Sequence, residues 1–174
     1  GNEECFAIQD LVMAIDGSGS ITADNFDILK EYVVKLVSRY KGVINEVELM
    51  KVGIVQFGNG EILEDGTISN ALKILPLTSD MQAVTEAVEG LEFLKGFTNM
   101  AQAFSLSDKM FSEKGRQDSQ SAILTITDGK PSFQFQTQQV VDSLEEKGIQ
   151  RYFITIQEEE GTETDLMKKW ASAP

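Results

Sequence analysis

The decisive stretch of this chain is residues 11–20, which read LVMAIDGSGS. Its first five residues are apolar, as in a strand buried on both faces, and residues 23–40 then show the apolar spacing of a helix. The turn between them carries Asp16, Ser18 and Ser20, separated by glycines that let the backbone bend and approach a bound ion. Carboxylate and hydroxyl oxygens are hard ligands, which favour Mg²⁺, Mn²⁺ or Ca²⁺ over Zn²⁺ or Cu²⁺.

Strand-like and helix-like segments alternate along the rest of the chain. Strands are expected at 10–16, 51–57, 74–77, 122–127 and 152–156, and helices at 23–40, 80–89, 100–110, 137–147 and 164–170. This alternation predicts a parallel sheet with helices on both faces, and Pro76 suits an edge strand. No repeat or linker interrupts the pattern, so one α/β domain is expected over residues 1–174.

The composition narrows the classes of function. Acidic side chains number 28 against 15 basic ones, and the net charge of −13 argues against nucleic acid and anionic membrane surfaces as partners. The longest apolar stretches are too short to span a bilayer. The chain has no histidine, which removes the commonest general base, the usual zinc ligand and every Ser-His triad. A binding module is therefore favoured over an enzyme.

A second acidic loop follows the predicted strand 122–127, where Asp128 occupies the position that Asp16 has after the first strand. In open α/β sheets, ligands collect outside the carboxyl ends of strands where the strand order reverses. If the two strands are neighbours there, Asp16 and Asp128 face each other, and the loop before residue 100 adds the hydroxyl of Thr98. With the two serines this makes an oxygen-only site, in which two carboxylates balance one divalent cation and one coordination position stays open.

On these motifs the chain resembles a von Willebrand factor type A domain with a metal-ion-dependent adhesion site. That family's signature is Asp-x-Ser-x-Ser, then Gly-x-Thr, then Thr-Asp-Gly, and here the three motifs stand in the same order at 16–20, 96–98 and 127–129. The resemblance extends over about residues 9–156. It implies a doubly wound, mostly parallel, Rossmann-like sheet with one antiparallel edge strand and helices on both faces. The implied metal is Mg²⁺, with Mn²⁺ or Ca²⁺ as alternatives, and its implied ligands are Asp16, Ser18, Ser20, Thr98 and Asp128.

The resemblance also implies a function, that of a non-catalytic adhesion module in an extracellular or cell-surface protein. The metal would coordinate an acidic residue of a protein partner. Nucleic acid is not expected as a partner, and the domain is not expected to insert into a membrane. The residues expected at the partner interface lie beside the metal ligands: Gly17, Gly19, Phe97, Gly129 and Lys130.

Two features depart from the family pattern. Relatives continue past a segment like residues 171–174 into one more strand and a last helix, so this chain is expected to be short at that end. The strand 152–156 would then be an exposed edge, able to pair with another chain. Extracellular relatives often bond a cysteine ahead of the first strand to one after the last helix. Cys5 is either an unpaired thiol or, as the resemblance implies, the first half of such a pair.

Other interpretations stay open. The turn at 16–20 could be solvated, or could cap the following helix through Ser20 or Thr22. A dinucleotide-binding fingerprint fits poorly, because its third glycine would fall on Thr22 and phosphate would meet Asp16. The same Mg²⁺ could serve a hydrolase, with Lys130 as the nearby cation, and the same fold could serve an intracellular scaffold.

Overall fold

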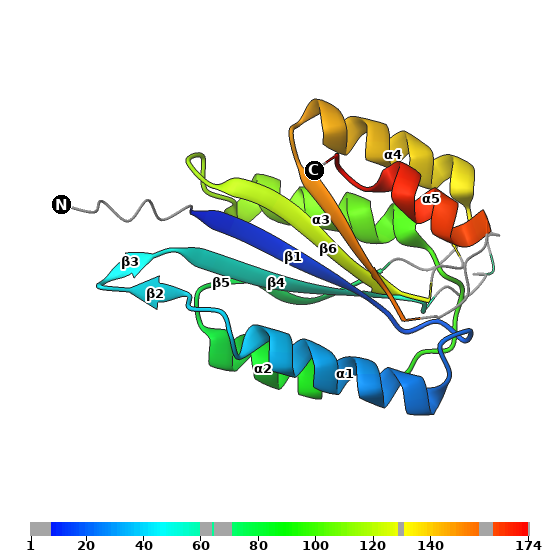
Figure 1. Ribbon diagram of the computed structural model, residues 1–174, viewed down its shortest axis with the longest axis horizontal. Coiled ribbons are helices and arrows are strands. Elements are labelled where there is room, and N and C mark those ends of the chain that lie inside the picture. The colour runs from blue at the N-terminus through cyan, green and yellow to red at the C-terminus, as the bar shows by residue number, and fades with distance from the viewer. Residues whose placement is uncertain (1–7, 60–63, 65–70, 129–130, 157–161, 174) are drawn as a thin grey trace.

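The computed structural model describes residues 8–59, 64, 71–128, 131–156 and 162–173. In chain order the elements are β1 (Gln9–Asp16), α1 (Ala23–Val37), β2 (Val43–Ile44), β3 (Val47–Glu48), β4 (Met50–Phe57), β5 (Leu72–Thr78), α2 (Met81–Glu89), α3 (Met100–Lys114), β6 (Gln120–Thr127), α4 (Gln134–Glu146), β7 (Gln150–Thr155) and α5 (Thr162–Trp170). Five of the strands form one sheet in the order β5-β4-β1-β6-β7 (Figure 1).

The sheet is parallel except at one edge. β1 pairs in parallel with β4 and β6, β6 pairs in parallel with β7, and β5 runs antiparallel to β4. The chain passes from β1 to β4 on one side and later returns to β6 on the other, so the strand order reverses at β1. Ile15 lies opposite Ile126, which places the carboxyl ends of β1 and β6 side by side. The predicted fold class is therefore confirmed.

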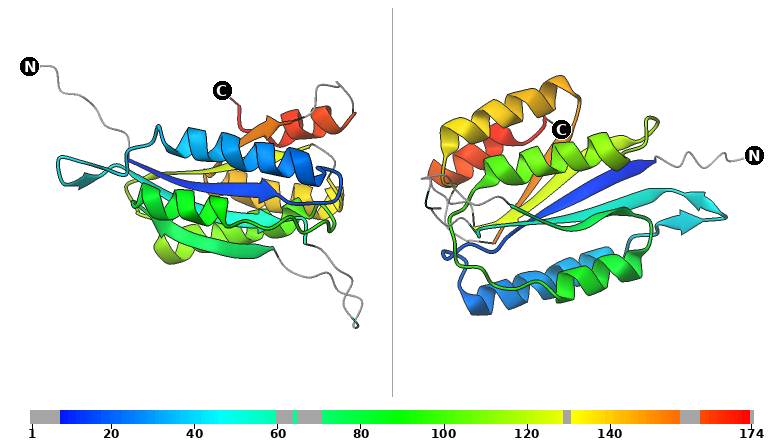
Figure 2. Two further views of the ribbon diagram at one scale, coloured as in Figure 1. Left: turned by 90° about the horizontal axis from the view of Figure 1, so that it is seen from below. Right: turned by 180° about the vertical axis from the view of Figure 1, so that it is seen from behind.

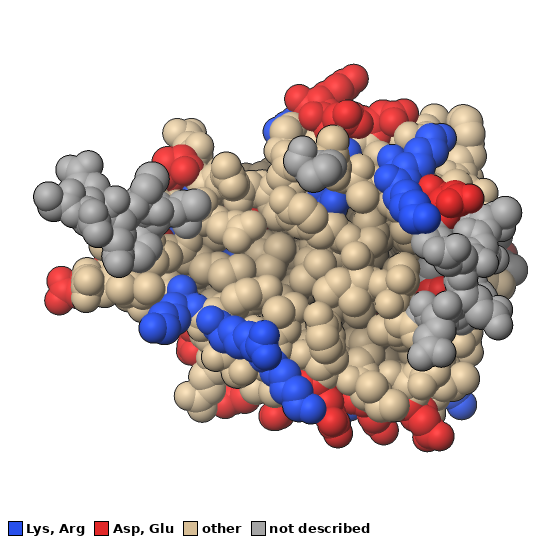
Figure 3. Space-filling model, in the orientation of Figure 1, with Lys and Arg blue, Asp and Glu red and all other residues tan. Residues whose placement is uncertain are grey.

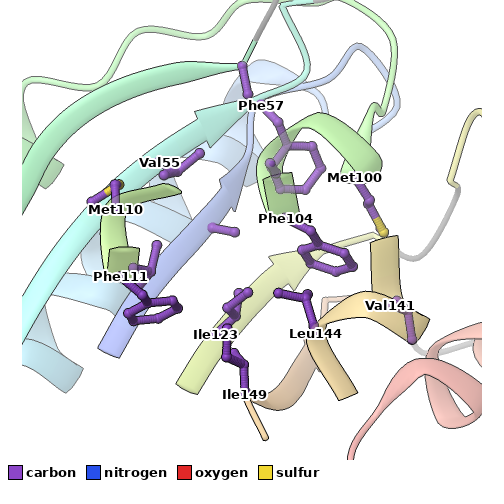
Figure 4. Packing of buried hydrophobic residues seen from close by; sticks show 14 of the residues in the cluster. Val55, Phe57, Met100, Phe104, Met110, Phe111, Ile123, Val141, Leu144 and Ile149 are labelled. Atoms are coloured by element: carbon purple, nitrogen blue, oxygen red, sulfur yellow. The ribbon is translucent and has the colours of Figure 1, made fainter. Parts of the chain in front are cut away.

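Helices cover both faces of the sheet, with α1 and α2 on one side and α3, α4 and α5 on the other (Figures 1 and 2). Alternate residues of β1 contribute to two separate cores: Met13 and Ile15 pack under α1 and α2, while Val12 and Ala14 face α3. Figure 4 shows the second core, with Phe104 of α3 and Leu144 of α4 meeting over the sheet. Two covered faces explain why β1 reads as an unbroken apolar run.

Several boundaries differ from the sequence-based predictions. Helix α1 ends at Val37 rather than at Tyr40, because the chain turns there and the N–H of Tyr40 bonds to the carbonyl of Val37. Helix α4 starts at Gln134, three residues before the predicted start, since its glutamine-rich first turn has no apolar periodicity. The hairpin of β2 and β3 was not predicted, because two-residue strands are too short to show a period.

β7 is the edge strand on the side opposite β5, as predicted. The segment after α5 covers one end of its outer edge: the N–H of Ser172 donates to the carbonyl of Arg151, and the N–H of Arg151 donates to Ser172 Oγ, both at 2.9 Å. The described helices include none with the length and apolar character to cross a membrane. Cys5 lies outside the described residues, and one domain over 1–174 stays a prediction.

Candidate metal-binding site

Asp16 is the last residue of β1 and is fully buried. Its Oδ1 accepts a hydrogen bond from the backbone N–H of Ser18 at 2.8 Å, and its Oδ2 accepts one from Thr127 Oγ1 at 2.6 Å. Burial raises the pKa of Asp16 to about 6, in spite of these hydrogen bonds, and the nearby charge of Asp128 acts in the same direction. Among the described residues no lysine or arginine forms an ion pair with Asp16.

The two serines of the turn point their hydroxyls toward each other. Ser18 is buried and Ser20 is exposed, and their Oγ atoms lie 3.1 Å apart. Neighbouring oxygens around Mg²⁺, with Mg–O of about 2.1 Å, lie about 3 Å apart in an octahedron, so the spacing fits two ligands of one ion. The alternative capping function has no support at Thr22, which precedes α1 but makes no side-chain cap hydrogen bond.

Backbone hydrogen bonds bring the loop that carries Thr98 against the turn. Gly19 donates its N–H to the carbonyl of Gly96 at 3.2 Å, and Lys95 donates to the carbonyl of Gly17 at 2.9 Å. Thr98 itself is buried, with 4% of its surface exposed. These main-chain hydrogen bonds hold the loop against the turn that carries Ser18 and Ser20.

Asp128 directly follows β6 and is also buried, at 4% exposed. The two loops on this side of the sheet are joined by the N–H of Ser132, which donates to the carbonyl of Thr98 at 2.9 Å. The three loops that carry the five predicted ligands therefore lie together at the carboxyl ends of β1 and β6. No three His, Cys, Asp or Glu residues cluster in the described part of the chain, so a cation held here would depend on the hydroxyls as well as on the two carboxylates.

The residues predicted at the partner interface differ in exposure. Phe97 has 47% of its surface exposed, Gly19 is exposed and Gly17 is buried. Gly129 and Lys130 lie outside the described residues.

The supporting residues of the site were not predicted from the sequence. Gln56 donates its side-chain N–H to the carbonyl of Glu92 at 2.6 Å and so holds the start of the Thr98 loop. Gly58 has φ of 91°, and a Cβ there would lie 2.2 Å from the Ser18 nitrogen. The signal for Gln56 was a polar residue near the end of an otherwise apolar, buried strand. Thr127 stood in the Thr-Asp-Gly motif, but its function as a donor to Asp16 was not predicted.

The sheet and this constellation define an α/β domain with an oxygen-lined candidate cation site at its topological switch point. Residues 10–174 match the family described as the von Willebrand factor type A domain, and the chain belongs to that family. It is 31% identical over 127 residues to the collagen alpha-1(XXI) chain of Xenopus laevis, and 29% identical over 132 residues to the collagen alpha-2(VI) chain of Gallus gallus. These matches cover 71% and 74% of this chain but 12% of each collagen.

Solved structures share the fold at low sequence identity. The manganese-loaded TRAP protein of Plasmodium vivax has a TM-score of 0.74 and 17% identity, over 95% of this chain and 63% of that one. Proximal thread matrix protein 1 from the mussel byssus, described with a zinc-occupied MIDAS motif, has a TM-score of 0.77 and 20% identity, over 97% of this chain and 42% of that one.

Proposed function

We propose that this domain is a non-catalytic adhesion module that binds an acidic residue of a protein partner through a divalent cation. The ligands are the five oxygen-bearing residues of the candidate site: Asp16, Ser18, Ser20, Thr98 and Asp128. One observation carries the proposal: Asp16 is fully buried near a second buried carboxylate, Asp128, and no lysine or arginine among the described residues forms an ion pair with Asp16. When bound, a divalent cation supplies that countercharge and an open position for an external carboxylate.

The chain's own residues prepare the site. Thr127 and the N–H of Ser18 hold one Asp16 oxygen each, which fixes the carboxylate plane while leaving further lone pairs on both oxygens. Ser18 and Ser20 add oxygens without adding charge. Mg²⁺ is the first choice, with Mn²⁺ and Ca²⁺ as alternatives. The structure of the mussel protein is described with zinc in its MIDAS motif, so Zn²⁺ is included among the cations tested for this domain.

An extracellular or cell-surface location is part of the proposal, and the collagen relatives support it.

The proposed partner is a protein, because the net charge of −13 disfavours nucleic acid. On the face in Figure 3, acidic side chains border the molecule at top and bottom, while lysine and arginine form a diagonal row at the lower left and a group at the upper right. Gly17, Gly19, Phe97, Gly129 and Lys130 are proposed at the partner interface, and pairing of β7 with another chain stays a prediction.

The first test is cation uptake by the EDTA-stripped domain, measured by calorimetry with Mg²⁺, Mn²⁺, Ca²⁺ and Zn²⁺ in turn. Asp16→Asn and Asp128→Asn are expected to weaken uptake by roughly 10- to 100-fold or more, because each removes a charged ligand. Asp24→Asn is the matched control, since Asp24 is an exposed acidic residue in the first turn of α1. If wild-type protein binds none of the four cations, the proposal is overturned.

The second test is binding of a carboxylate. A blocked peptide with one glutamate is titrated into labelled domain in Mg²⁺ and again in EDTA, and only the first titration is expected to shift the signals of the three site loops. Binding that survives EDTA removes the metal from the mechanism. Turnover of aryl phosphates that Ser18→Ala abolishes would favour the hydrolase alternative. Localisation of the protein in its own cells would separate an extracellular module from an intracellular scaffold.

A further inference from the structure

Two phenylalanines meet at the rim of the candidate site. The ring centroids of Phe97 and Phe133 lie 6.4 Å apart with an interplanar angle of 77°, which is the favourable edge-to-face arrangement. Phe97 directly precedes Thr98, and Phe133 directly follows Ser132, whose N–H bonds to the Thr98 carbonyl. The ring pair therefore belongs to the two loops that carry Thr98 and Asp128.

The stability of the isolated domain explains neither the exposure of the Phe97 ring nor the backbone conformation of Phe133, whose own side chain is partly buried. Phe97 is 47% exposed, although Thr98, Asn99 and Met100 after it are all buried. Phe133 is the residue before the first turn of α4 and has a left-handed backbone, with φ of 58° and no side-chain cap hydrogen bond. That conformation disfavours an aromatic residue, while asparagine would both tolerate it and cap the helix. Strain and exposure side by side point to a contact outside the domain.

We infer that Phe97 and Phe133 form an apolar subsite that selects partners in which an apolar side chain lies close to the acidic residue. The inference rests on the proposed function, which it deepens by naming the partner's chemistry. The occupant is one segment of a protein partner, whose carboxylate meets the cation while its apolar neighbour packs on the two rings.

Charge and geometry favour this occupant. A domain with net charge −13 gives an acidic partner no long-range attraction, so affinity depends on short-range contacts next to the cation. Aromatic residues at such positions contribute strongly to binding once they are covered. In an extended segment, side chains two residues apart lie on the same side and about 7 Å apart, so an apolar residue near the acidic one reaches a ring beside Thr98.

The test uses blocked pentapeptides with a central glutamate. The parent peptide has serine at the other positions, and each derivative replaces one serine by leucine. Dissociation constants are measured by chemical-shift titration of the labelled domain at saturating Mg²⁺. At least one leucine peptide is expected to bind about tenfold more tightly than the parent, as one buried apolar contact at a hot spot provides.

Matched variants separate recognition from folding. Phe97→Ser and Phe133→Asn are each expected to abolish the leucine gain. Phe133→Asn is also expected to leave the affinity for the parent peptide unchanged, because Phe133 is not among the residues proposed at the metal-side partner interface. Phe133→Asn keeps the backbone, because asparagine adopts the left-handed conformation readily. Tyr152→Ser is the control: Tyr152 has the same exposed fraction as Phe97, 47%, but lies on β7, and its variant is expected to keep the gain.

The outcomes distinguish the two proposals. If all peptides bind in Mg²⁺ with equal affinity, or if both phenylalanine variants keep the leucine gain, the apolar subsite is overturned and the metal–carboxylate function stands. If no peptide binds in Mg²⁺, or binding is the same in EDTA, the proposed function itself fails.

Discussion

Strand β1 carries a buried aspartate at each end, and the two have opposite surroundings. Asp10, near the amino end, accepts hydrogen bonds from Arg116 Nε at 2.9 Å and Nη2 at 2.6 Å, from the Arg116 N–H at 2.7 Å and from Ser119 Oγ at 2.8 Å. Asp16, at the carboxyl end, accepts from an N–H and a hydroxyl and has Asp128 as its charged neighbour. Both are fully buried and both point to the face covered by α3.

The difference shows how one strand can serve stability and binding at once. A buried carboxylate needs a countercharge. At the amino end the chain provides it, and Arg116 also donates to the carbonyls of Gln9 and Glu48, so that it joins three segments. At the carboxyl end no described lysine or arginine forms an ion pair with Asp16, and in the proposed function the cation comes from solution.

The largest expected effect is at the amino end. Arg116→Ala leaves Asp10 charged, buried and without its cation, which should lower the free energy of unfolding by about 3–5 kcal/mol. Urea unfolding measures this. Lys147→Ala is the control, because it breaks the more exposed Lys147–Asp108 ion pair, which is expected to contribute at most about 1 kcal/mol. If both variants lose the same free energy of unfolding, the buried Asp10–Arg116 pair stabilises the fold no more than an exposed ion pair does.

The next effect is a pH dependence at the carboxyl end. The pKa of Asp16 is about 6 in the folded protein against 3.8 for the ordinary side chain, so the folded state binds the proton more tightly. The metal-free domain should therefore gain stability from Asp16 as pH falls from about 7 to 4, by up to about 3 kcal/mol. The measurement is unfolding in EDTA across this range, with Asp16→Asn as reference. If the free energies of unfolding of wild type and Asp16→Asn change in parallel with pH, the predicted contribution of Asp16 is contradicted.

A steric change at the same end should have a smaller effect. Gly58 and Gly148 both have positive φ, but a Cβ at Gly58 would lie 2.2 Å from the Ser18 nitrogen and one at Gly148 meets nothing within 4 Å. Gly148→Ala should lower the free energy of unfolding by about 1 kcal/mol through backbone strain alone. Gly58→Ala should cost about 2 kcal/mol in total and weaken cation uptake. If Gly58→Ala takes up cations as the wild type does, the close approach of Gly58 to Ser18 is not needed for cation binding.

The smallest effect concerns Thr22, a β-branched residue with φ of 68° in the turn after Ser20. Thr22→Gly relieves that strain and should raise the free energy of unfolding by up to about 1 kcal/mol, offset in part by the greater freedom of glycine in the unfolded chain. Glu46→Gly, at φ of 67° in the hairpin turn, is the matched change outside the site. A loss of stability in Thr22→Gly alone would show that the threonine side chain stabilises the turn.

Much of the fold was predictable because it depends on local pattern. The unbroken apolar run of β1 and the helical spacing after it predicted a strand covered on both faces, and Pro76 predicted an edge strand. Asp80 and Gly90 were predicted to start and end a helix, and the Asp80 side chain indeed accepts from the N–H groups of Gln82 and Ala83. The five candidate ligands were named because they stand in motifs of the chain itself.

Tertiary structure alone decided which of these residues meet. The hydrogen bond from Thr127 to Asp16 spans 111 residues and the Asp10–Arg116 contact spans 106, and no local period encodes either. The same is true of the ring pair of Phe97 and Phe133. The sequence by itself determined most of the elements, the candidate oxygen ligands and the acidic character. Strand order, set by long-range pairing and packing, determined that one buried aspartate meets an arginine and the other a second carboxylate.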